Sequence, residues 1–281
     1  MAQILVNPKN CETVSEPLRE KSIRRHLSAQ DRDDIKSIHV FPNISSTNDY
    51  LLENALDCKQ VSVCVAEQQT QGRGRYGHQW VSPAAVNLYL SMSWPLQVWR
   101  QEYETLSLWL LIAIAELLEK HGCKHIQLKW PNDVCVEGNK LAGILIERKV
   151  NQTRNNLIIG VGLNVAMSLN DNVEIETPWV DLISIKPDWQ LSRNELAAEL
   201  ISSFLKTLAK LEENQLCDLN NKWRQYDMLM NKKIEFLHKE KINIGCVKGI
   251  NNLGQIVLDI NGKFEHMHST YISEIKPIGN S

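Results

Sequence analysis

The stretch Lys129–Leu145 reads KWPNDVCVEGNKLAGIL. It alternates short aliphatic runs with Pro-Asn-Asp and Gly-Asn, which are typical of tight turns between strands. We therefore predict strands near 126–129, 134–136 and 141–147, with a turn at Gly138 and Asn139 joining the last two. Strands connected this closely pair antiparallel, so the stretch indicates an antiparallel sheet at the centre of the chain.

Helices and strands alternate on both sides of this sheet. Leu106, Trp109, Leu110, Ala113 and Leu117 form an apolar stripe at helical spacing, which is typical of core packing. SRNE at 192–195 is a capping box that opens another helix. The pattern predicts helices near 47–56, 103–120 and 192–213 and strands near 38–41, 61–67, 87–92 and 156–164. The fold class is therefore α+β, with helices packed on a sheet.

The two ends of the chain differ from this body. A short helix is predicted within 18–27, and short strands follow from Lys233 onward, with a type I′ hairpin signal at Asn261-Gly262. We expect three parts: an N-terminal extension with a linker helix at 1–36, a catalytic domain at 37–230, and a small β-barrel at 231–281.

Composition excludes several classes of protein. Charged residues make up 23% of the chain, and 31 Lys and Arg against 33 Asp and Glu give a net charge of −2, which argues against disorder and against a generally basic, nucleic-acid-binding surface. The most apolar run, 106–118, is too short to cross a bilayer, and the N-terminus lacks the features of a secretory signal. Seven cysteines without paired spacing fit a reducing compartment, so we expect the cytoplasm.

A glycine-rich loop, GRGRYG at 72–77, matches the dinucleotide fingerprint in spacing but not in context. A Rossmann loop opens a helix, whereas Pro83 and a strand pattern follow this one. Arg73 and Arg75 place two guanidinium groups, each with five N–H donors, on a close-folding backbone. The loop is therefore expected to close over an anion, and an exposed basic turn is the alternative.

Lys129 and Lys140 flank the sequence Pro131-Asn132-Asp133 in the central sheet. Polar side chains at the end of a strand lie where α/β sheets often bind ligands, so both lysines could face one pocket. The alternative is a hairpin in which Pro-Asn-Asp only turns the chain. HGCKH at 121–125 follows a helix stop and has no second ligand pair, so we predict no metal-ligating residues.

Five motifs occur together in an order that resembles the bacterial biotin protein ligases, over roughly residues 37–278. They are SSTN (45–48), AEQQTQGRGRYG (66–77), KWPND (129–133), KLAGIL (140–145) and IGVGLNV (159–165). The resemblance implies a mixed-sheet, class II synthetase-like catalytic domain followed by a small C-terminal β-barrel. It implies that biotin and ATP form biotinoyl-5′-AMP with Mg²⁺, after which a lysine of a biotin carboxyl carrier protein takes the biotinoyl group.

The resemblance also implies roles for individual residues. The residues expected around biotin are Ser46, Thr47, Asn48, Gln69, Arg73, Gly74, Arg75 and Lys140. Those expected to take part in the chemistry are Arg73, Arg75, Lys140 and Asp133, with Asp133 assisting the transfer step. Those expected at the nucleotide are Trp80, which would stack on adenine, Asn132 and Asn164.

Two alternatives are kept beside this interpretation. A lipoate or octanoate ligase or transferase shares the fold, although octanoyl transferases need a nucleophilic cysteine that no motif here positions. A biotin-sensing transcriptional regulator would need a DNA-binding domain, and only 36 residues precede Ser37. We therefore expect a ligase without DNA binding or membrane attachment, and a homodimer paired through its sheet is implied by the family.

Overall fold

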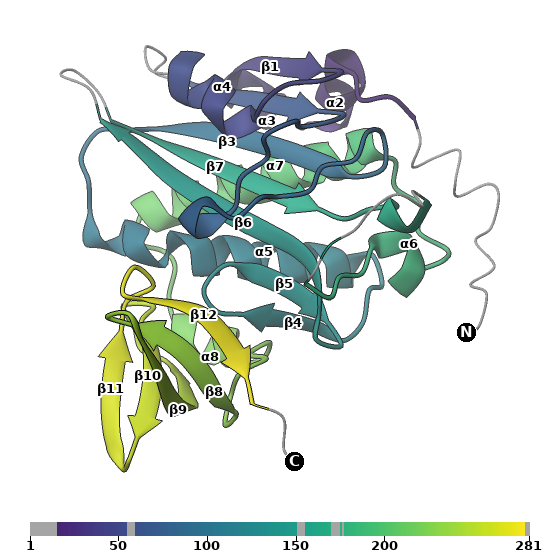
Figure 1. Ribbon diagram of the computed structural model, residues 1–281. Helices are drawn as coiled ribbons and strands as arrows, with labels where there is room; N and C mark the ends of the chain where they lie inside the picture. Colours follow the sequence, from purple (N-terminus) through teal and green to yellow (C-terminus); the bar gives the residue numbers. More distant parts are fainter. Residues whose placement is uncertain (1–15, 55–59, 151–154, 170–174, 176, 279–281) are drawn as a thin grey trace.

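The computed structural model describes residues 16–54, 60–150, 155–169, 175 and 177–278 (Figure 1). A seven-stranded sheet in the order β1-β2-β3-β7-β6-β5-β4 forms the body. β1 and β2 are parallel and every other neighbouring pair is antiparallel, so the sheet is mixed, as predicted. Its strands are β1 Ile35–Phe41, β2 Val61–Ala66, β3 Leu88–Leu96, β4 Ile126–Lys129, β5 Asp133–Val136, β6 Asn139–Val150 and β7 Asn155–Leu163.

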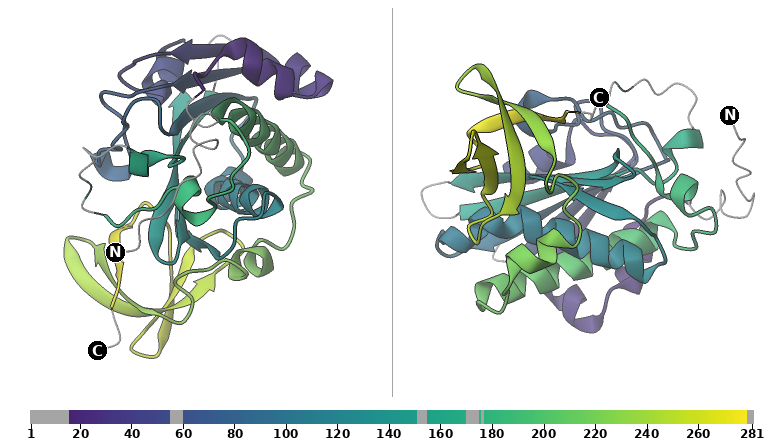
Figure 2. Two further views of the ribbon diagram at one scale, coloured as in Figure 1. Left: turned by 90° about the vertical axis from the view of Figure 1, so that its right-hand side faces the viewer. Right: turned by 90° about the horizontal axis from the view of Figure 1, so that it is seen from below.

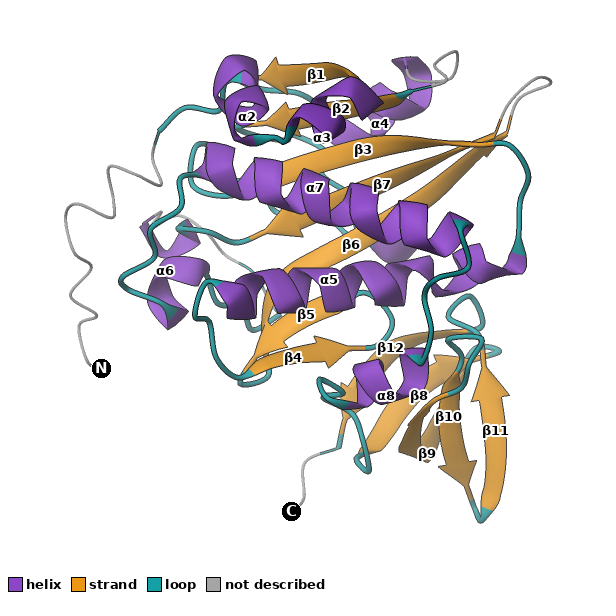
Figure 3. Cartoon of the chain, turned by 180° about the vertical axis from the view of Figure 1, so that it is seen from behind, coloured by secondary structure: helices purple, strands orange, loops and turns teal. Residues whose placement is uncertain are grey.

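Two long helices cover one face of this sheet (Figure 3). α5 (Leu106–Lys120) buries all five residues of the predicted apolar stripe, and all of them except Ala113 belong to the main core. α7 (Arg193–Glu212) begins at the predicted capping box: the Ser192 hydroxyl accepts from the backbone N–H of Glu195, whose carboxylate accepts from the N–H of Ser192. The described helices of the body also include α2 Glu20–His26, α3 Ala29–Asp34, α4 Thr47–Asn54, α6 Leu182–Ile185 and α8 Leu219–Arg224.

Both faces of β2 are buried because helices lie on each of them. Val63 and Val65 belong to the main core on the face of the long helices, whereas Cys64 packs with Leu51 of α4 and Ile158 on the opposite face. Burying both faces of a strand favours a continuous apolar run, as the sequence VSVCVA shows. α4 therefore lies on the sheet face that the two long helices leave open, and this face carries the site.

The C-terminal strands form a separate five-stranded antiparallel sheet in the order β11-β10-β9-β8-β12 (Figure 2). Asn261 and Gly262 both have positive φ, which confirms the predicted hairpin turn between β10 and β11. β12 is an edge strand of this sheet. The strands are β8 Lys233–His238, β9 Lys241–Ile250, β10 Ile256–Ile260, β11 Lys263–Met267 and β12 Ile272–Pro277.

The structure corrects the position of one predicted turn. Glu137 and Gly138 are the positive-φ residues between β5 and β6, and Asn139 already pairs with Val136. A two-residue hairpin loop needs positive φ at both central positions, and here Glu137 and Gly138 occupy them. The turn therefore lies one residue earlier than predicted. The segment before the sheet also contains α3, which was not predicted. Among the described helices, none is long and apolar enough to cross a membrane.

Candidate active site

A cleft of about 950 Å³ opens on the sheet face that carries α4. Its floor is made by glycines of the two central strands β6 and β7. Their strand neighbours Ala142 and Leu163 point into the helix-covered core, so Gly143 and Gly162 face the cleft. The floor is therefore bare backbone, which lets other groups lie close to the sheet.

Two side chains lie directly on this floor. A Cβ on Gly160 would come within 2.3 Å of the Asn48 Oδ1 atom, and one on Gly162 within 2.3 Å of the Trp80 ring. Trp80 thus lies on the sheet inside the cleft, and its buried Nε1 has no hydrogen-bond partner in the described part of the chain. The Lys140 Nζ atom is 5.1 Å from the centre of the Trp80 ring. Gly160 and Gly162 are required because Asn48 and Trp80 lie so close to the backbone of the sheet. The sequence analysis did not assign them this role.

The first turn of α4 supplies a cluster of uncharged polar groups. Ser46 caps the helix, accepting from the backbone N–H of Asp49. The Gln69 Oε1 atom accepts from both the backbone N–H and the hydroxyl of Thr47, at 2.9 and 3.1 Å. Ser91 on β3 donates to the Asn48 Oδ1 atom at 2.6 Å. Buried amides and hydroxyls held this firmly can present fixed donors and acceptors to a neutral polar ligand.

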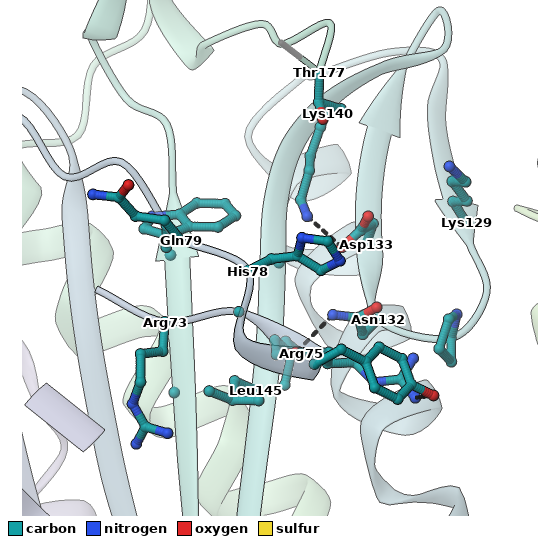
Figure 4. Close-up of a pocket in the computed structure, with 18 of the residues that line it drawn as sticks. Arg73, Arg75, His78, Gln79, Lys129, Asn132, Asp133, Lys140, Leu145 and Thr177 are labelled. Atoms are coloured by element: carbon teal, nitrogen blue, oxygen red, sulfur yellow. Dashed lines mark hydrogen bonds and ion pairs between the residues drawn. The ribbon is translucent and has the colours of Figure 1, made fainter. Parts of the chain in front are cut away.

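We define the flap as residues 72–80. Its two arginines, Arg73 and Arg75, lie in different surroundings. Arg73 is ion-paired with Asp49 and with Glu147, 3.1 Å away, and points away from Lys140 and Asp133 (Figure 4). Arg75 donates to the Ser269 carbonyl at 2.6 Å. Burial lowers the pKa of Arg75 from its ordinary value, and the nearby Tyr76 and Asp133 oppose that shift.

Asp133 and Lys140 meet across the β5–β6 hairpin. The Lys140 Nζ atom lies 2.8 Å from the Asp133 Oδ1 atom, and both side chains are about one-quarter exposed or less. Asn132 lines the cleft beside them, and its amide donates to the Ile144 carbonyl of β6 at 3.0 Å (Figure 4). The Pro-Asn-Asp segment therefore both turns the chain and places polar groups in the cleft, so the two interpretations of this hairpin are compatible.

Asn164 is placed differently from the other predicted residues. It does not line the cleft, and its buried amide donates to the carbonyls of Lys140 and Val180, at 3.3 and 3.1 Å. These bonds tie the end of β7 to Lys140 of β6 and to Val180, and the contact of Asn164 with the nucleotide stays a prediction. All other predicted site residues line the one cleft.

Some lining residues were not predicted from the sequence. Strand β12 of the C-terminal sheet borders the cleft and contributes Glu274 and Lys276, although no local pattern in that segment signals a site. Glu147 and Ser91 hold Asn48 and were also missed; the alternation of LYLSM along β3 does place Ser91 on the site face. These contacts depend on the tertiary arrangement of distant segments.

No thiol of the described residues is poised for nucleophilic chemistry in the cleft. None of the described lining residues is a cysteine. Burial raises the pKa of Cys135 on β5 to about 12, and of Cys64 beyond that, so both remain protonated at neutral pH. The described residues also include no group of three or more His, Cys, Asp and Glu side chains arranged to hold a metal ion.

The lining has an excess of positive charge. Five cationic side chains line the cleft, whereas the carboxylates in the lining are those of Asp133 and Glu274. They are Arg73, Arg75, Lys129, Lys140 and Lys276. A cleft with uncharged polar groups at one side and clustered cations at the other suits an acid with a neutral polar head, together with phosphates. Fold and cleft thus define a ligase-type protein built on an open mixed sheet.

Comparison with known proteins agrees with this class. Residues 40–164 match the Biotin/lipoate A/B protein ligase family. The Bifunctional ligase/repressor BirA of Escherichia coli is 36% identical over 228 residues, covering 80% of this chain and 70% of that protein. The Biotin--[acetyl-CoA-carboxylase] ligase of Mycobacterium tuberculosis is 29% identical over 255 residues, covering 88% of this chain and 92% of that protein.

The fold agrees with solved structures as well. The biotin protein ligase of Aquifex aeolicus, solved with biotin and ATP, superposes with a TM-score of 0.70 at 23% identity, covering 86% of this chain and all of that one. Since the Escherichia coli relative is well above 30% identical over most of both chains, the chain belongs to the biotin protein ligase family.

Proposed function

We propose that this chain catalyses the ATP-dependent attachment of biotin to a lysine of a biotin carboxyl carrier protein in the cytoplasm, through biotinoyl-5′-AMP. The observation that carries the proposal is one cleft that joins the uncharged groups around Thr47 and Asn48 to the cations around Lys140. Amide and hydroxyl groups suit the neutral ureido ring of biotin, and cations suit its carboxylate and the ATP phosphates. A cleft of about 950 Å³ is within the range for binding both.

In the first step a biotin carboxylate oxygen attacks the α-phosphorus of ATP, an oxygen–phosphorus bond forms, and pyrophosphate leaves. Both reactants are anions, so the site must hold them in line and offset their charges. Lys140 is the cation that we place at the junction of carboxylate and phosphate, with Asp133 fixing its ammonium at 2.8 Å. Arg75 adds a second, half-buried cation to the same region.

In the second step the amine of the carrier lysine attacks the acyl carbon, a carbon–nitrogen bond forms, and AMP leaves. The carbon–oxygen bond to AMP breaks, the amine loses one proton to water, and Asp133 is the carboxylate that we place to orient the amine. The acyl group passes directly to the carrier, which agrees with the protonated, buried thiols of Cys64 and Cys135. Trp80, which lies over Gly162, is the ring that we place against the adenine of the nucleotide.

Mg²⁺ is proposed as the partner of ATP. With no cluster of three metal-ligating side chains among the described residues, the ion would be held mainly by phosphate oxygens and water. Asp133 and Glu274 are the carboxylates in the lining that could complete its coordination. When bound, Mg²⁺ would offset the charge that develops on the leaving pyrophosphate.

The proposal is tested by two assays on the purified full chain. Biotin should drive exchange of labelled pyrophosphate into ATP, and a biotin carboxyl carrier domain should gain one biotinoyl group on its lysine, as measured by mass spectrometry. A carrier with that lysine replaced by arginine is the control, and lipoate and octanoate are the competing acids. Exchange driven by lipoate or octanoate but not by biotin would refute the proposal.

A homodimer paired through the seven-stranded sheet is also proposed. β4 is covered on its outer side, since Leu128 exchanges backbone hydrogen bonds with Tyr226 and Met228. The opposite edge, β1, has β2 as its one strand partner among the described residues. Sedimentation with and without biotin and ATP measures the oligomeric state, and a monomer under both conditions would refute this part of the proposal.

A further inference from the structure

The tip of the flap is bonded to the C-terminal sheet. The Tyr76 hydroxyl lies 2.5 Å from the Ser269 carbonyl oxygen and 3.0 Å from that of Ile272, and Arg75 donates to the same Ser269 carbonyl at 2.6 Å. The Arg75 guanidinium also lies 4.9 Å from the centre of the Tyr76 ring. These bonds join segments almost two hundred residues apart in the sequence, and each acceptor is a backbone carbonyl beside β12.

The flap behaves as one unit because its own backbone is paired. Arg73 and Gln79 form an antiparallel bridge, and the backbone N–H of Gly74 donates to the His78 carbonyl at 2.7 Å. At the base of the hairpin the backbone N–H of Trp80 donates to the Gly72 carbonyl, and Arg73 ties the flap to the catalytic body through its ion pairs with Asp49 and Glu147. The tip is tied to the C-terminal sheet, so the flap crosses the cleft in front of Asn132 and Asp133 (Figure 4).

Tyr76 adopts a backbone conformation that its residue type disfavours. Its φ is +54°, in the left-handed region that non-glycine residues rarely occupy. Its ring is half-exposed, at 54%, so burial of the ring does not account for this position. The two carbonyl contacts of the hydroxyl are the interactions that offset the cost of the conformation.

We propose that Tyr76 is a positioning residue that pins the flap to the C-terminal sheet and so determines how long biotinoyl-5′-AMP is retained. The inference rests on the proposed function and goes beyond it, since it assigns to the C-terminal sheet a role in how long biotinoyl-5′-AMP stays bound. The pinned tip lies on the side of the cleft that holds Asp133, Lys140 and β12. The groups around Thr47 are held by Gln69 and Ser91, which do not depend on Tyr76.

The test compares Tyr76→Phe with Tyr271→Phe in the full chain. The first removes the bonded hydroxyl, which also accepts a hydrogen bond from Arg75 at 3.2 Å, and keeps the ring beside Arg75. Tyr271 is an exposed tyrosine two residues from Ser269 for which no hydroxyl bond is found among the described residues, so it is the matched control. Labelled biotinoyl-5′-AMP is formed on each protein, and its escape is followed by filtration after a chase with unlabelled compound.

We expect Tyr76→Phe to release the adenylate about three- to tenfold faster than the unmodified chain, as loss of one or two neutral hydrogen bonds predicts. Biotin affinity without ATP should change less than about twofold, and Tyr271→Phe should behave like the unmodified chain. Unchanged retention in Tyr76→Phe, or an equal loss of biotin affinity and retention, would overturn the inference. If the unmodified chain makes no adenylate at all, it is the proposed function that fails.

Discussion

The two sheets of this molecule contribute to one cleft in different ways. The seven-stranded sheet supplies its floor, where Gly143, Gly160 and Gly162 bring backbone directly under the side chains of the site. The C-terminal sheet supplies an edge strand, β12, and the carbonyls that hold the flap tip. The floor is part of the core of the body. The flap and β12 form the cover of the cleft, which depends on a few bonds between separate segments.

Burial differs in the same way. Asn48 on the floor is 4% exposed and bonded on both sides of its amide, while Tyr76 on the flap is 54% exposed. Bonds at partly exposed groups contribute less and open more readily than buried networks. We therefore expect changes in the floor to affect binding and chemistry, and changes in the cover to affect how long the intermediate is kept.

Removing the Lys140 charge should give the largest effect. Lys140→Met keeps a long side chain but takes away the cation that we place at the reacting atoms, so adenylation should slow by about 10²–10³-fold. Biotin binding should weaken by less than about tenfold, since the uncharged groups at α4 remain. Pyrophosphate exchange and equilibrium binding measure the two quantities.

The control is Lys120→Met, which removes an exposed lysine paired with Glu199 on the far side of the sheet. It should leave adenylation unchanged. Equal losses of adenylation and biotin binding in Lys140→Met would show that Lys140 contributes to binding alone.

Filling the floor should give the next largest effect. In Gly160→Ala the new methyl group would lie 2.3 Å from the Asn48 Oδ1 atom, which Ser91 holds in place. Asn48 must shift, so biotin affinity should fall by about tenfold, with a loss of about 1–3 kcal/mol in the free energy of unfolding. Calorimetric titration and denaturant unfolding measure these changes.

The matched substitution in the other sheet is Gly245→Ala, where the nearest atom is 3.2 Å away on the Ile260 side chain. It should leave biotin affinity unchanged, because Ile260 can yield. If both substitutions reduce biotin affinity equally, the contrast between the two sheets is wrong.

The floor and the cover also differ in how well the sequence predicts them. Strand alternation and the capping box at Ser192 are local signals, and they predicted the strands of the body and its covering helices, whereas the mixed sheet was implied by the family resemblance. The motifs predicted the residues that line the cleft because each lies at a strand end or a helix start. The orientation of Arg73 toward Glu147 and the binding of Arg75 to Ser269 are set by tertiary contacts, so no pattern along the chain indicates them.

Asn164 illustrates the same limit. The resemblance carried by IGVGLNV implies a contact with the nucleotide, which stays a prediction, and the structure adds that the Asn164 amide donates to two backbone carbonyls. The sequence does not show whether an asparagine amide binds the backbone or faces a ligand. Here the backbone partners are Lys140 of β6 and Val180, which belongs to the segment that pairs with β6 at Lys140. The turn at Glu137 was displaced for a related reason, because glutamate is not a residue that typically marks positive φ.

Removing the flap cation should have an intermediate effect. Arg75→Gly loses a charged donor to the C-terminal sheet and a cation of the cleft, so adenylate escape should rise about tenfold while its synthesis stays detectable. The filtration assay used for Tyr76→Phe measures escape. Arg75→Ala separates the lost charge from the added backbone freedom of glycine, and normal retention in both variants would contradict the role of this arginine.

The smallest effect is expected where the body and the C-terminal part of the chain join. Asp227 lies beside the edge strand β4, and its carboxylate accepts from the backbone N–H of Leu229 at 2.9 Å. Burial raises the pKa of Asp227 above its ordinary value, so the folded chain binds this proton more tightly than the unfolded chain does. Ionisation as the pH rises through the folded pKa therefore lowers stability, and at neutral pH the carboxylate costs free energy.

Asp227→Asn keeps the acceptor oxygen for Leu229 and cannot ionise, so it should raise the melting temperature by about 1–3 °C at pH 7. The difference should disappear below about pH 3, where the carboxyl group is protonated in both states. Adenylate retention should stay unchanged, because the flap bonds of Tyr76 do not involve this junction. A variant less stable than the unmodified chain at pH 7 would show that the negative charge itself stabilises the junction.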